Sequence, residues 1–199
     1  MTPLLAAGLE LQSFFEARNW KFCVIGGLAV HRWGNPRATQ DVDLTLLTEF
    51  GKEESYVDEI LAHFEPRRPD SRQLALVARV LLINASNKVP VDVALGALQF
   101  EVQAVQRATP YEFAPGCTLM TLSAEDLIIS KAFSNRDRDW VDVHDVILLQ
   151  GKKVNWRYID KQLAALCELK EDNEPVSRLA DLRAKFAATK PRLRRGTKD

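Results

Sequence analysis

The sequence has few cysteines, and their number and spacing exclude two kinds of site. Its 199 residues include three cysteines, Cys23, Cys117 and Cys167, which lie far apart along the chain. This spacing contains no C-x-x-C metal or redox motif, and an odd number leaves no complete set of disulfides. We therefore expect a protein of a reducing compartment, the cytoplasm.

The sequence also lacks an excess of charge of either sign and any long apolar run. Its 27 Lys and Arg residues balance 27 Asp and Glu residues, so a nucleic-acid site, if present, must be local. The most apolar internal run, residues 74–83, contains Arg79 and is shorter than the roughly 20 residues of a membrane span. The first 15 residues lack a basic segment and include Glu10, unlike a secretory signal peptide. We expect no membrane partner.

Hydrophobic periodicity predicts a folded chain that contains both helices and strands. Apolar residues make up 46% of the sequence and charged residues 27%, which are ordinary globular values. The patterns predict helices at 4–17, 53–64 and 96–106, and strands at 22–25, 40–47, 73–83, 89–95 and 111–121, with 73–83 and 89–95 forming a hairpin.

From Ser123 onward the pattern is helical only. Ser123 and Asp126 have the spacing of a capping box, and two amphipathic stretches at 156–166 and 176–186 follow. The last ten residues carry five positive charges and one negative charge. We predict a core at 1–120 and a C-terminal helical region with a basic tail at 121–199.

Three aspartates on predicted strands are candidate metal ligands. Asp41 and Asp43 are two residues apart, so both carboxylates lie on one face of a strand. Asp92 lies on a later strand, on the face opposite that of Val91 and Val93. Adjacent carboxylates repel one another unless a cation neutralises them, and oxygen ligands suit one or two Mg²⁺ ions. An isolated D-x-D is otherwise more often a solvated strand end.

A glycine pair and two polar residues precede the acids. Gly26 and Gly27 follow a buried strand and open a short helix, where backbone N–H groups can approach phosphates without a Cβ in the way. Arg37 and Thr39 offer a guanidinium and a hydroxyl to the same phosphates. A glycine pair alone is more often a simple turn.

Taken together, the string G-G-x13-D-x-D with Arg37, Thr39 and a later strand Asp resembles the nucleotidyltransferase superfamily, nearest to the AbiEii-type toxins and their uncharacterised minimal relatives. The resemblance covers residues 22–95. It implies an α+β nucleotidyltransferase fold: a mixed central sheet flanked by helices and followed by a C-terminal helical segment. It also implies an enzyme that transfers a nucleoside monophosphate from an NTP and releases pyrophosphate, with two Mg²⁺ ions held by Asp41, Asp43 and Asp92. Many members have Ser where Gly27 stands, so one hydroxyl contact to the triphosphate is missing.

The helical part resembles the AbiEii-type pattern more loosely, through a Lys that precedes an Arg-Asp pair. These residues are Lys131, Arg138 and Asp139 in this sequence. On one continuous helix Lys131, Arg138 and Asp142 share a face, so Lys131 becomes a catalytic candidate and Arg138 a nucleotide-binding candidate. The alternative is a ladder of salt bridges, and the roles of Asp139 and Asp142 stay open.

Several aromatic and histidine side chains are weaker candidates. His31 and His144 suit acid–base chemistry, but no second His or Cys stands at metal-ligand spacing. Trp33, Trp140 and Trp156 offer faces for base stacking, although packing roles are more common for such residues.

Three functional hypotheses follow, and the first two differ in the molecule that accepts the nucleoside monophosphate. The favoured acceptor is RNA, most plausibly the 3′ end of a tRNA, for a toxin that has a cognate antitoxin or acts in phage defence. The first alternative is a small molecule, because residues 26–44 also resemble lincosamide and aminoglycoside nucleotidyltransferases. The second alternative is a catalytically inactive module that binds nucleotide or a partner.

Overall fold

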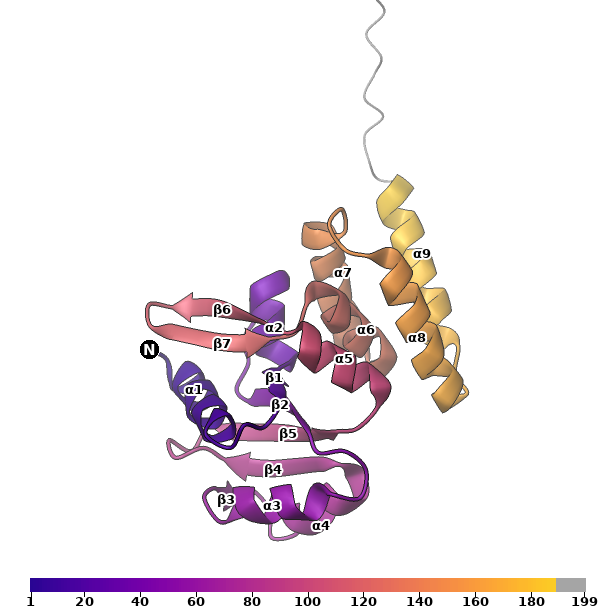
Figure 1. Ribbon diagram of the computed structural model, residues 1–199. Coiled ribbons are helices and arrows are strands. Elements are labelled where there is room, and N and C mark those ends of the chain that lie inside the picture. Colours follow the sequence, from indigo (N-terminus) through magenta and orange to yellow (C-terminus); the bar gives the residue numbers. More distant parts are fainter. Residues whose placement is uncertain (189–199) are drawn as a thin grey trace, which may run out of the picture.

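The computed structural model describes residues 1–188, and its centre is one mixed sheet (Figure 1). The strand order is β3-β4-β5-β2-β1-β7-β6. The strands are β1 (Phe22–Val24), β2 (Val42–Leu47), β3 (Glu65–Pro66), β4 (Val80–Asn84), β5 (Pro90–Gly96), β6 (Thr109–Ala114) and β7 (Cys117–Thr121). Strands β2 and β5 are parallel, as are β1 and β7, and the other neighbouring strands are antiparallel.

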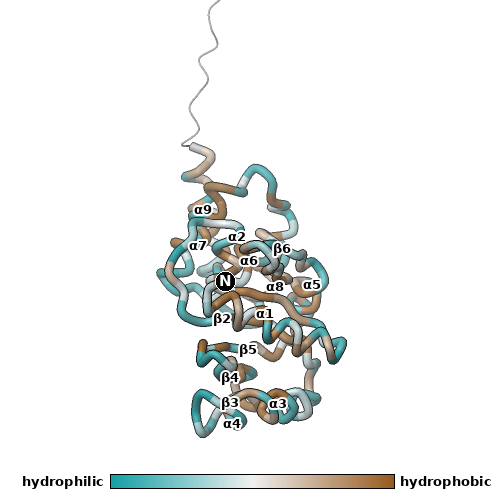
Figure 2. The backbone as a smooth tube through the Cα atoms, turned by 90° about the vertical axis from the view of Figure 1, so that its left-hand side faces the viewer, coloured by the Kyte–Doolittle hydropathy of each residue, from teal (hydrophilic) through white to brown (hydrophobic). Residues whose placement is uncertain are grey.

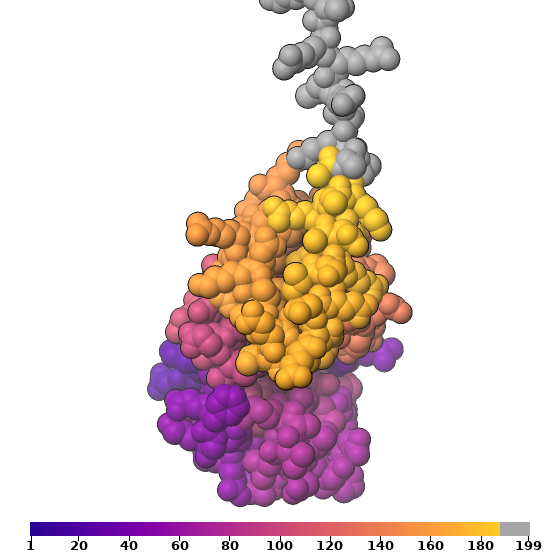
Figure 3. Space-filling view, turned by 90° about the vertical axis from the view of Figure 1, so that its right-hand side faces the viewer, coloured from indigo at the N-terminus to yellow at the C-terminus, as the bar shows by residue number. Residues whose placement is uncertain are grey.

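The helices of the described chain lie on both faces of the sheet and at one end of it. They are α1 (Pro3–Glu16), α2 (Gly26–Trp33), α3 (Glu53–Leu61), α4 (Ser71–Ala78), α5 (Gln99–Arg107), α6 (Ala124–Ser134), α7 (Asp137–Gln150), α8 (Trp156–Lys170) and α9 (Glu174–Ala188). The space-filling view shows α8 and α9 side by side at one end of the molecule, with α3 and α4 at the other (Figure 3). The predicted α+β fold with a mixed sheet and a helical C-terminal part is therefore confirmed.

Strand alternation divides the buried apolar residues into two clusters. On β2, Val42, Leu44 and Leu46 face a cluster shared with α1, α3 and α4. The opposite face packs against a second cluster from α2 and α5 to α9, to which Cys23 of β1 belongs. Figure 2 shows hydrophobic colour along parts of the central strands and hydrophilic colour in the loops and along parts of the helices. Asp43 and Asp92 point to the second face, where α2 and α6 pack, because they alternate with the buried residues of their strands.

The C-terminal helices are anchored to the rest of the chain by a buried carboxylate. Asp126 is fully buried on α6, where it accepts hydrogen bonds from Arg107 of α5 at 3.0 Å and from the Tyr158 hydroxyl of α8 at 2.8 Å. Its backbone N–H donates to the Ser123 side chain, so the predicted helix start at Ser123 is confirmed. The division into 1–120 and 121–199 stays a prediction, because the second apolar cluster joins α2 and α5 with the later helices. The basic tail at 190–199 lies outside the described residues.

Two local predictions of strands are wrong in detail. Residues 73–83 are not one strand: the segment contains α4, then Arg79 in the left-handed region with φ of 57°, then β4. Ser71 and Ala75 are the buried residues of α4, and their i, i+4 spacing is that of a helix. Residues 111–121 form a hairpin of β6 and β7, turned at Gly116 with φ of 73°. The predicted hairpin of 73–83 and 89–95 is confirmed in its strand part, since β4 and β5 are antiparallel neighbours.

The predicted continuous helix through Lys131 and Asp142 is also wrong. Helix α6 ends at Ser134, and Asn135 has φ of 57°, a left-handed conformation that Asn tolerates better than most residues. The indole N–H of Trp140 donates to Oδ1 of Asn135 at 2.8 Å and holds this turn. Within residues 1–188, no helix is both long and apolar enough to cross a membrane.

Candidate active site

A cavity of about 460 Å³ opens where the N-terminus of α2 meets β2, β5 and α6. Nine residues singled out from the sequence all line it: Gly26, Gly27, Arg37, Thr39, Asp41, Asp43, Asp92, Lys131 and Arg138. These residues come from five separate parts of the chain. Their roles in binding and catalysis stay predictions, but the structure places them together.

The three acids meet because of the register between β2 and β5. Asp43 and Asp92 are paired residues on these parallel strands, and Asp41 lies one residue before β2 begins. Carboxylate oxygens of the three residues lie within 4.8 Å of one another. Hard divalent cations prefer oxygen ligands of this kind, so the donor set fits Mg²⁺. One of these oxygens, Oδ1 of Asp92, is buried and accepts no hydrogen bond from any described residue.

The acids repel one another in the absence of a cation. Burial raises the pKa of Asp43 above its ordinary value, and the charges of Asp41 and Asp92 raise it further. A hydrogen bond from the backbone N–H of Gly27 opposes this shift in part. A bound cation would remove the repulsion, which is the electrostatic condition of a metal site.

Gly26 and Gly27 must lack side chains, because other side chains lie too close to both positions. Gly26 has φ of 57°, and a Cβ built on it would lie 1.8 Å from Oδ2 of Asp43. A Cβ on Gly27 would lie 2.5 Å from Oγ1 of Thr39. The Thr39 hydroxyl thus occupies the space of any side chain at position 27, and it donates to Oδ1 of Asp41 at 3.0 Å. This explains why Gly, and not Ser, stands at the second position of the loop.

Lys131 lies at the centre of a chain of ion pairs beside the acids. It is buried, and its Nζ lies 2.8 Å from Oδ1 of Asp139 and 2.9 Å from Oδ2 of Asp142. The Arg37 guanidinium holds Asp142 on the other side through Nε at 2.9 Å and Nη2 at 3.0 Å. Arg136 pairs with Asp139 at 2.5 Å. Lys131 thus forms salt bridges from α6 to α7, and not the ladder along one helix that was the alternative to a functional role.

The ion pairs keep both buried aspartates charged. Burial opposes the ionisation of Asp142, but hydrogen bonds from Arg37 and Lys131 outweigh it and lower the pKa of the carboxyl. Burial likewise opposes the ionisation of Asp139, and hydrogen bonds from Arg136 and Lys131 lower its pKa. Arg138 differs, because its exposed guanidinium has no ion-pair partner among residues 1–188. It is the cation at the cavity most available to a phosphate.

The weaker sequence candidates do not line the cavity. The His31 ring contacts the Arg37 carbonyl oxygen at 2.6 Å, and His144 lies against Phe186 at the surface. The indoles of Trp33 and Trp156 donate to backbone carbonyls, and Trp140 is buried. These side chains pack or support the loop.

Two arginines that the sequence did not single out lie near the acids. Arg136 lines the cavity, and Nη2 of Arg67 lies 2.6 Å from Oδ1 of Asp92. The dense run of charges at 136–139 was a signal for the first. Arg67 stands in a loop that reads only as a turn between two prolines, so its place depends on the pairing of β3 with β4.

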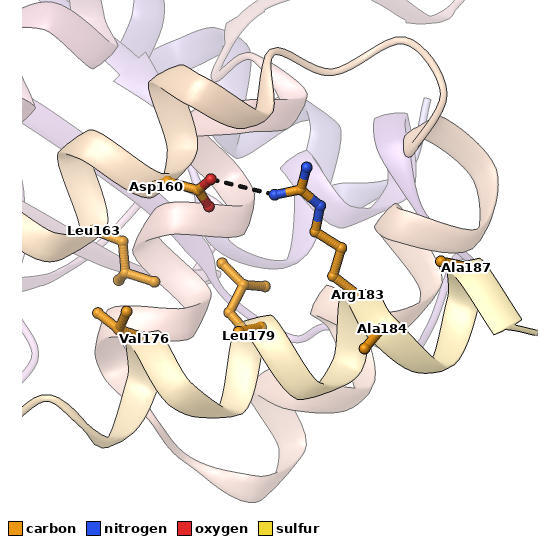
Figure 4. Close-up of a pocket in the computed structure, with 8 residues that line it drawn as sticks. Asp160, Leu163, Val176, Leu179, Arg183, Ala184 and Ala187 are labelled. Atoms are coloured by element: carbon orange, nitrogen blue, oxygen red, sulfur yellow. Dashed lines mark hydrogen bonds and ion pairs between the residues drawn. The ribbon is translucent and has the colours of Figure 1, made fainter.

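A second hollow lies between α8 and α9 (Figure 4). Leu163, Val176 and Leu179 form an apolar floor, and Arg183 pairs with Asp160 at 3.2 Å. It shares no lining residue with the acidic cavity, and it offers few groups for chemistry.

The fold and the acidic cavity define a nucleotidyltransferase. Residues 4–194 match the family described as "Nucleotidyltransferase of unknown function (DUF6036)", and the chain belongs to this family. It is therefore a nucleotidyltransferase enzyme, which confirms the predicted superfamily. No curated protein matches the sequence significantly.

The chain is similar to several solved structures, and the first of those named here supports the fold. The chain is similar to an antigenic nucleotidyltransferase-like protein from Paracoccidioides brasiliensis, with a TM-score of 0.51, 18% identity, and coverage of 87% of this chain and 91% of that chain. It is also similar to the lincosamide antibiotic adenylyltransferase LnuA, with a TM-score of 0.49, 11% identity, and coverage of 71% and 94%. A third similar structure is the enzyme ANT(2")-Ia in complex with adenylyl-2"-tobramycin, with a TM-score of 0.47, 18% identity, and coverage of 93% and 99%.

Proposed function

We propose that this protein transfers a nucleoside monophosphate from an NTP to an acceptor, in a reaction that depends on Mg²⁺ bound by Asp41, Asp43 and Asp92. The observation that carries the proposal is the convergence of these three carboxylates within 4.8 Å beside a glycine loop at a helix N-terminus. Three oxygen donors are a sensible minimum for two ions. When bound, the ions would neutralise charge on the phosphates and activate the acceptor hydroxyl.

The residues of the chain then bind and orient the NTP. The N-terminus of α2 presents the backbone N–H group of Gly26, which suits a phosphate oxygen, whereas the N–H group of Gly27 donates to Asp43. The guanidinium of Arg138, unpaired within residues 1–188, adds a cationic contact to the phosphates. Arg37 also contributes, because its Nη1 is not bonded to Asp142 and can donate to a phosphate oxygen. Burial and the neighbouring acids raise the pKa of Asp43, and the buried positive charge of Lys131 offsets a small part of that rise.

The reaction forms one bond and breaks another. The acceptor oxygen bonds to the α-phosphorus, the bond from that phosphorus to the bridging oxygen of the β-phosphate breaks, and pyrophosphate leaves with the electron pair. The hydroxyl proton passes to a carboxylate of the cluster and then to water. Positioning and electrostatics supply most of the catalysis in such phosphoryl chemistry.

For the acceptor we favour RNA, specifically a tRNA 3′ end, in a cytoplasmic toxin of the AbiEii type with a cognate antitoxin. Support comes from the exposed guanidinium groups of Arg136 and Arg138 at the cavity, which suit a polyanion. The Lys131 and Arg138-Asp139 pattern adds to it. The alternative acceptor is a small molecule, supported by the resemblance of residues 26–44 to antibiotic nucleotidyltransferases.

Label transfer from each of the four α-labelled NTPs distinguishes these acceptors. The full chain is incubated with Mg²⁺ and with tRNA, with tRNA whose 3′ diol has been oxidised by periodate, or with tobramycin and lincomycin. We expect label on intact tRNA and none on oxidised tRNA. Label on an antibiotic alone would support the small-molecule alternative, and no label on any acceptor would support the inactive module.

Two aspartate variants and the growth of cells that express the protein complete the test. Asp43→Asn should abolish transfer, whereas Asp58→Asn, an exposed carboxylate on α3, should not. Expression of the wild type should arrest growth, and Asp43→Asn should relieve the arrest. Arrest that persists in Asp43→Asn would argue against a toxin that acts by nucleotidyl transfer.

A further inference from the structure

Arg67 lies beside the acid cluster and follows β3, the strand at one edge of the sheet. Its Nη2 is 2.6 Å from Oδ1 of Asp92, and the two side chains are 28% and 30% exposed. Nothing in the sequence pattern assigns this arginine a role. Its position on the edge of the sheet explains the contact.

The register of β3, β4, β5 and β2 places Arg67 next to the acids. The backbone N–H of Arg67 donates to the carbonyl of Leu82 at 3.0 Å, just after β3 pairs with β4. Leu82 is paired with Asp92, and Asp92 is paired with Asp43. Residues paired across neighbouring strands point to the same face of a sheet. Arg67 therefore extends the row that holds two of the three acids.

The contact between Arg67 and Asp92 is an ion pair without a hydrogen bond. Oδ1 of Asp92 is buried, and no described residue donates a hydrogen bond to it. Arg37, by contrast, holds Asp142 through two hydrogen bonds. A guanidinium close to a carboxylate but poorly aligned supplies charge compensation with little directional bonding. The pair is thus suited to being exchanged for another cation.

Two other cations at the cavity are paired with carboxylates other than Asp92. Lys131 is shared by Asp139 and Asp142, and Arg136 is paired with Asp139. Among residues 1–188, the salt bridge of Asp92 is with Arg67.

We propose that Arg67 is the counter-ion of Asp92 in the cation-free protein and competes with the divalent cation for this carboxylate. The inference rests on the proposed metal-binding role of Asp92. Cation binding displaces the guanidinium, so Arg67 lowers the affinity of the site for the cation. The effect is modest, because an ion pair whose two side chains are both partly exposed contributes little.

Isothermal titration of the full-length protein with Mn²⁺ tests the inference without an activity assay. Arg67→Gln should bind Mn²⁺ about two- to fivefold more tightly than the wild type, because it removes a partly exposed competing charge. Arg67→Lys keeps the charge and should stay near the wild-type dissociation constant. Arg68→Gln is the matched control, because Arg68 is exposed and pairs with Asp70. It should leave the dissociation constant unchanged.

The outcomes separate this inference from the proposed function. Wild-type binding that is lost in Asp92→Asn but unchanged or weaker in Arg67→Gln would overturn the role of Arg67 alone. No binding by the wild type would overturn both the metal site and this inference. If Arg67→Gln fails to fold by circular dichroism, Arg67→Met takes its place in the same titration and carries the same expected tightening.

Discussion

Arg37 donates two hydrogen bonds to Asp142, from Nε to Oδ1 at 2.9 Å and from Nη2 to Oδ2 at 3.0 Å. The two residues are 105 positions apart in the sequence. Asp142 also lies 2.9 Å from Lys131, and its side chain is 3% exposed. The pair connects the loop that leads into Asp41 to helix α7. Arg37 therefore holds the position of this loop, besides any contact it makes to phosphates.

Removing Asp142 should destabilise the protein more than removing an exposed aspartate. Asp142→Ala leaves Lys131 buried with Asp139 alone and frees Arg37, which is 37% exposed. Loss of one partner from a buried ion pair costs about 3–5 kcal/mol, and the exposure of Arg37 reduces this to about 1–3 kcal/mol. Urea unfolding monitored by circular dichroism measures the change. Asp160→Ala, a substitution of an exposed residue, should cost less than about 0.5 kcal/mol. Equal losses would show that the Asp142 pairs add no stability.

Stability should fall in acid because of Asp139 and Asp142. Both carboxyls have lowered pKa values in the folded protein, with hydrogen bonds from Arg136, Arg37 and Lys131 outweighing burial. Their stabilisation is complete above the unfolded pKa of about 4 and is lost as the pH falls through the lower folded values. Unfolding free energies at pH 6 and pH 3 should therefore differ less in Asp142→Asn than in the wild type. The same acid loss in both proteins would contradict this assignment.

Gly26 should be far less tolerant of a side chain than another glycine with positive φ. Gly26 and Gly51 have φ of 57° and 78°, so Ala at either position costs about 1–2 kcal/mol in backbone strain. Only at Gly26 would the new Cβ collide with Oδ2 of Asp43, since Gly51 has open space around it. Gly26→Ala should abolish pyrophosphate release, and Gly51→Ala should retain it at a somewhat lower melting temperature. Similar activity in both variants would mean that Asp43 can move without loss of function.

Arg138 should contribute to NTP binding and not to folding. Its side chain is exposed at the cavity, so Arg138→Gln removes a charge without leaving a buried partner. We expect the KM for NTP to rise about tenfold, the loss of one charge-assisted phosphate contact, with an unchanged melting temperature. Arg157→Gln, on the exposed face of α8 and outside the cavity, is the control and should leave KM unchanged. An unchanged KM in Arg138→Gln would remove this residue from the nucleotide site.

The strand pattern was enough to predict where the acids lie. Asp43 and Asp92 each alternate with buried valines and leucines, and their strands proved to be paired neighbours. The glycine pair was found because backbone close to a ligand needs residues without a Cβ. These features depend on local periodicity and on residue chemistry, both of which a single sequence displays.

Features that depend on long-range pairing were not visible in the sequence. The turn at Asn135 folds α7 back beside α6 and turns a predicted helical face into a buried cluster of Lys131, Asp139 and Asp142. Arg67 approaches Asp92 only because β3 pairs with β4. Strand β3 has two residues, too few for a sequence pattern to predict this pairing. The clash that excludes Ser at position 27 comes from Thr39, twelve residues later in the chain.

Pyrophosphate release provides the most direct test that the three-aspartate cavity carries out nucleotidyl transfer. The measurement compares wild type, Asp43→Asn and the exposed control Asp58→Asn, each with NTP, cellular RNA and a small-molecule extract as acceptors, with and without Mg²⁺. We predict release by wild type and Asp58→Asn that requires Mg²⁺, and a loss of at least about a hundredfold in Asp43→Asn. Release at wild-type rates by Asp43→Asn, or by the wild type without a divalent cation, would contradict the account.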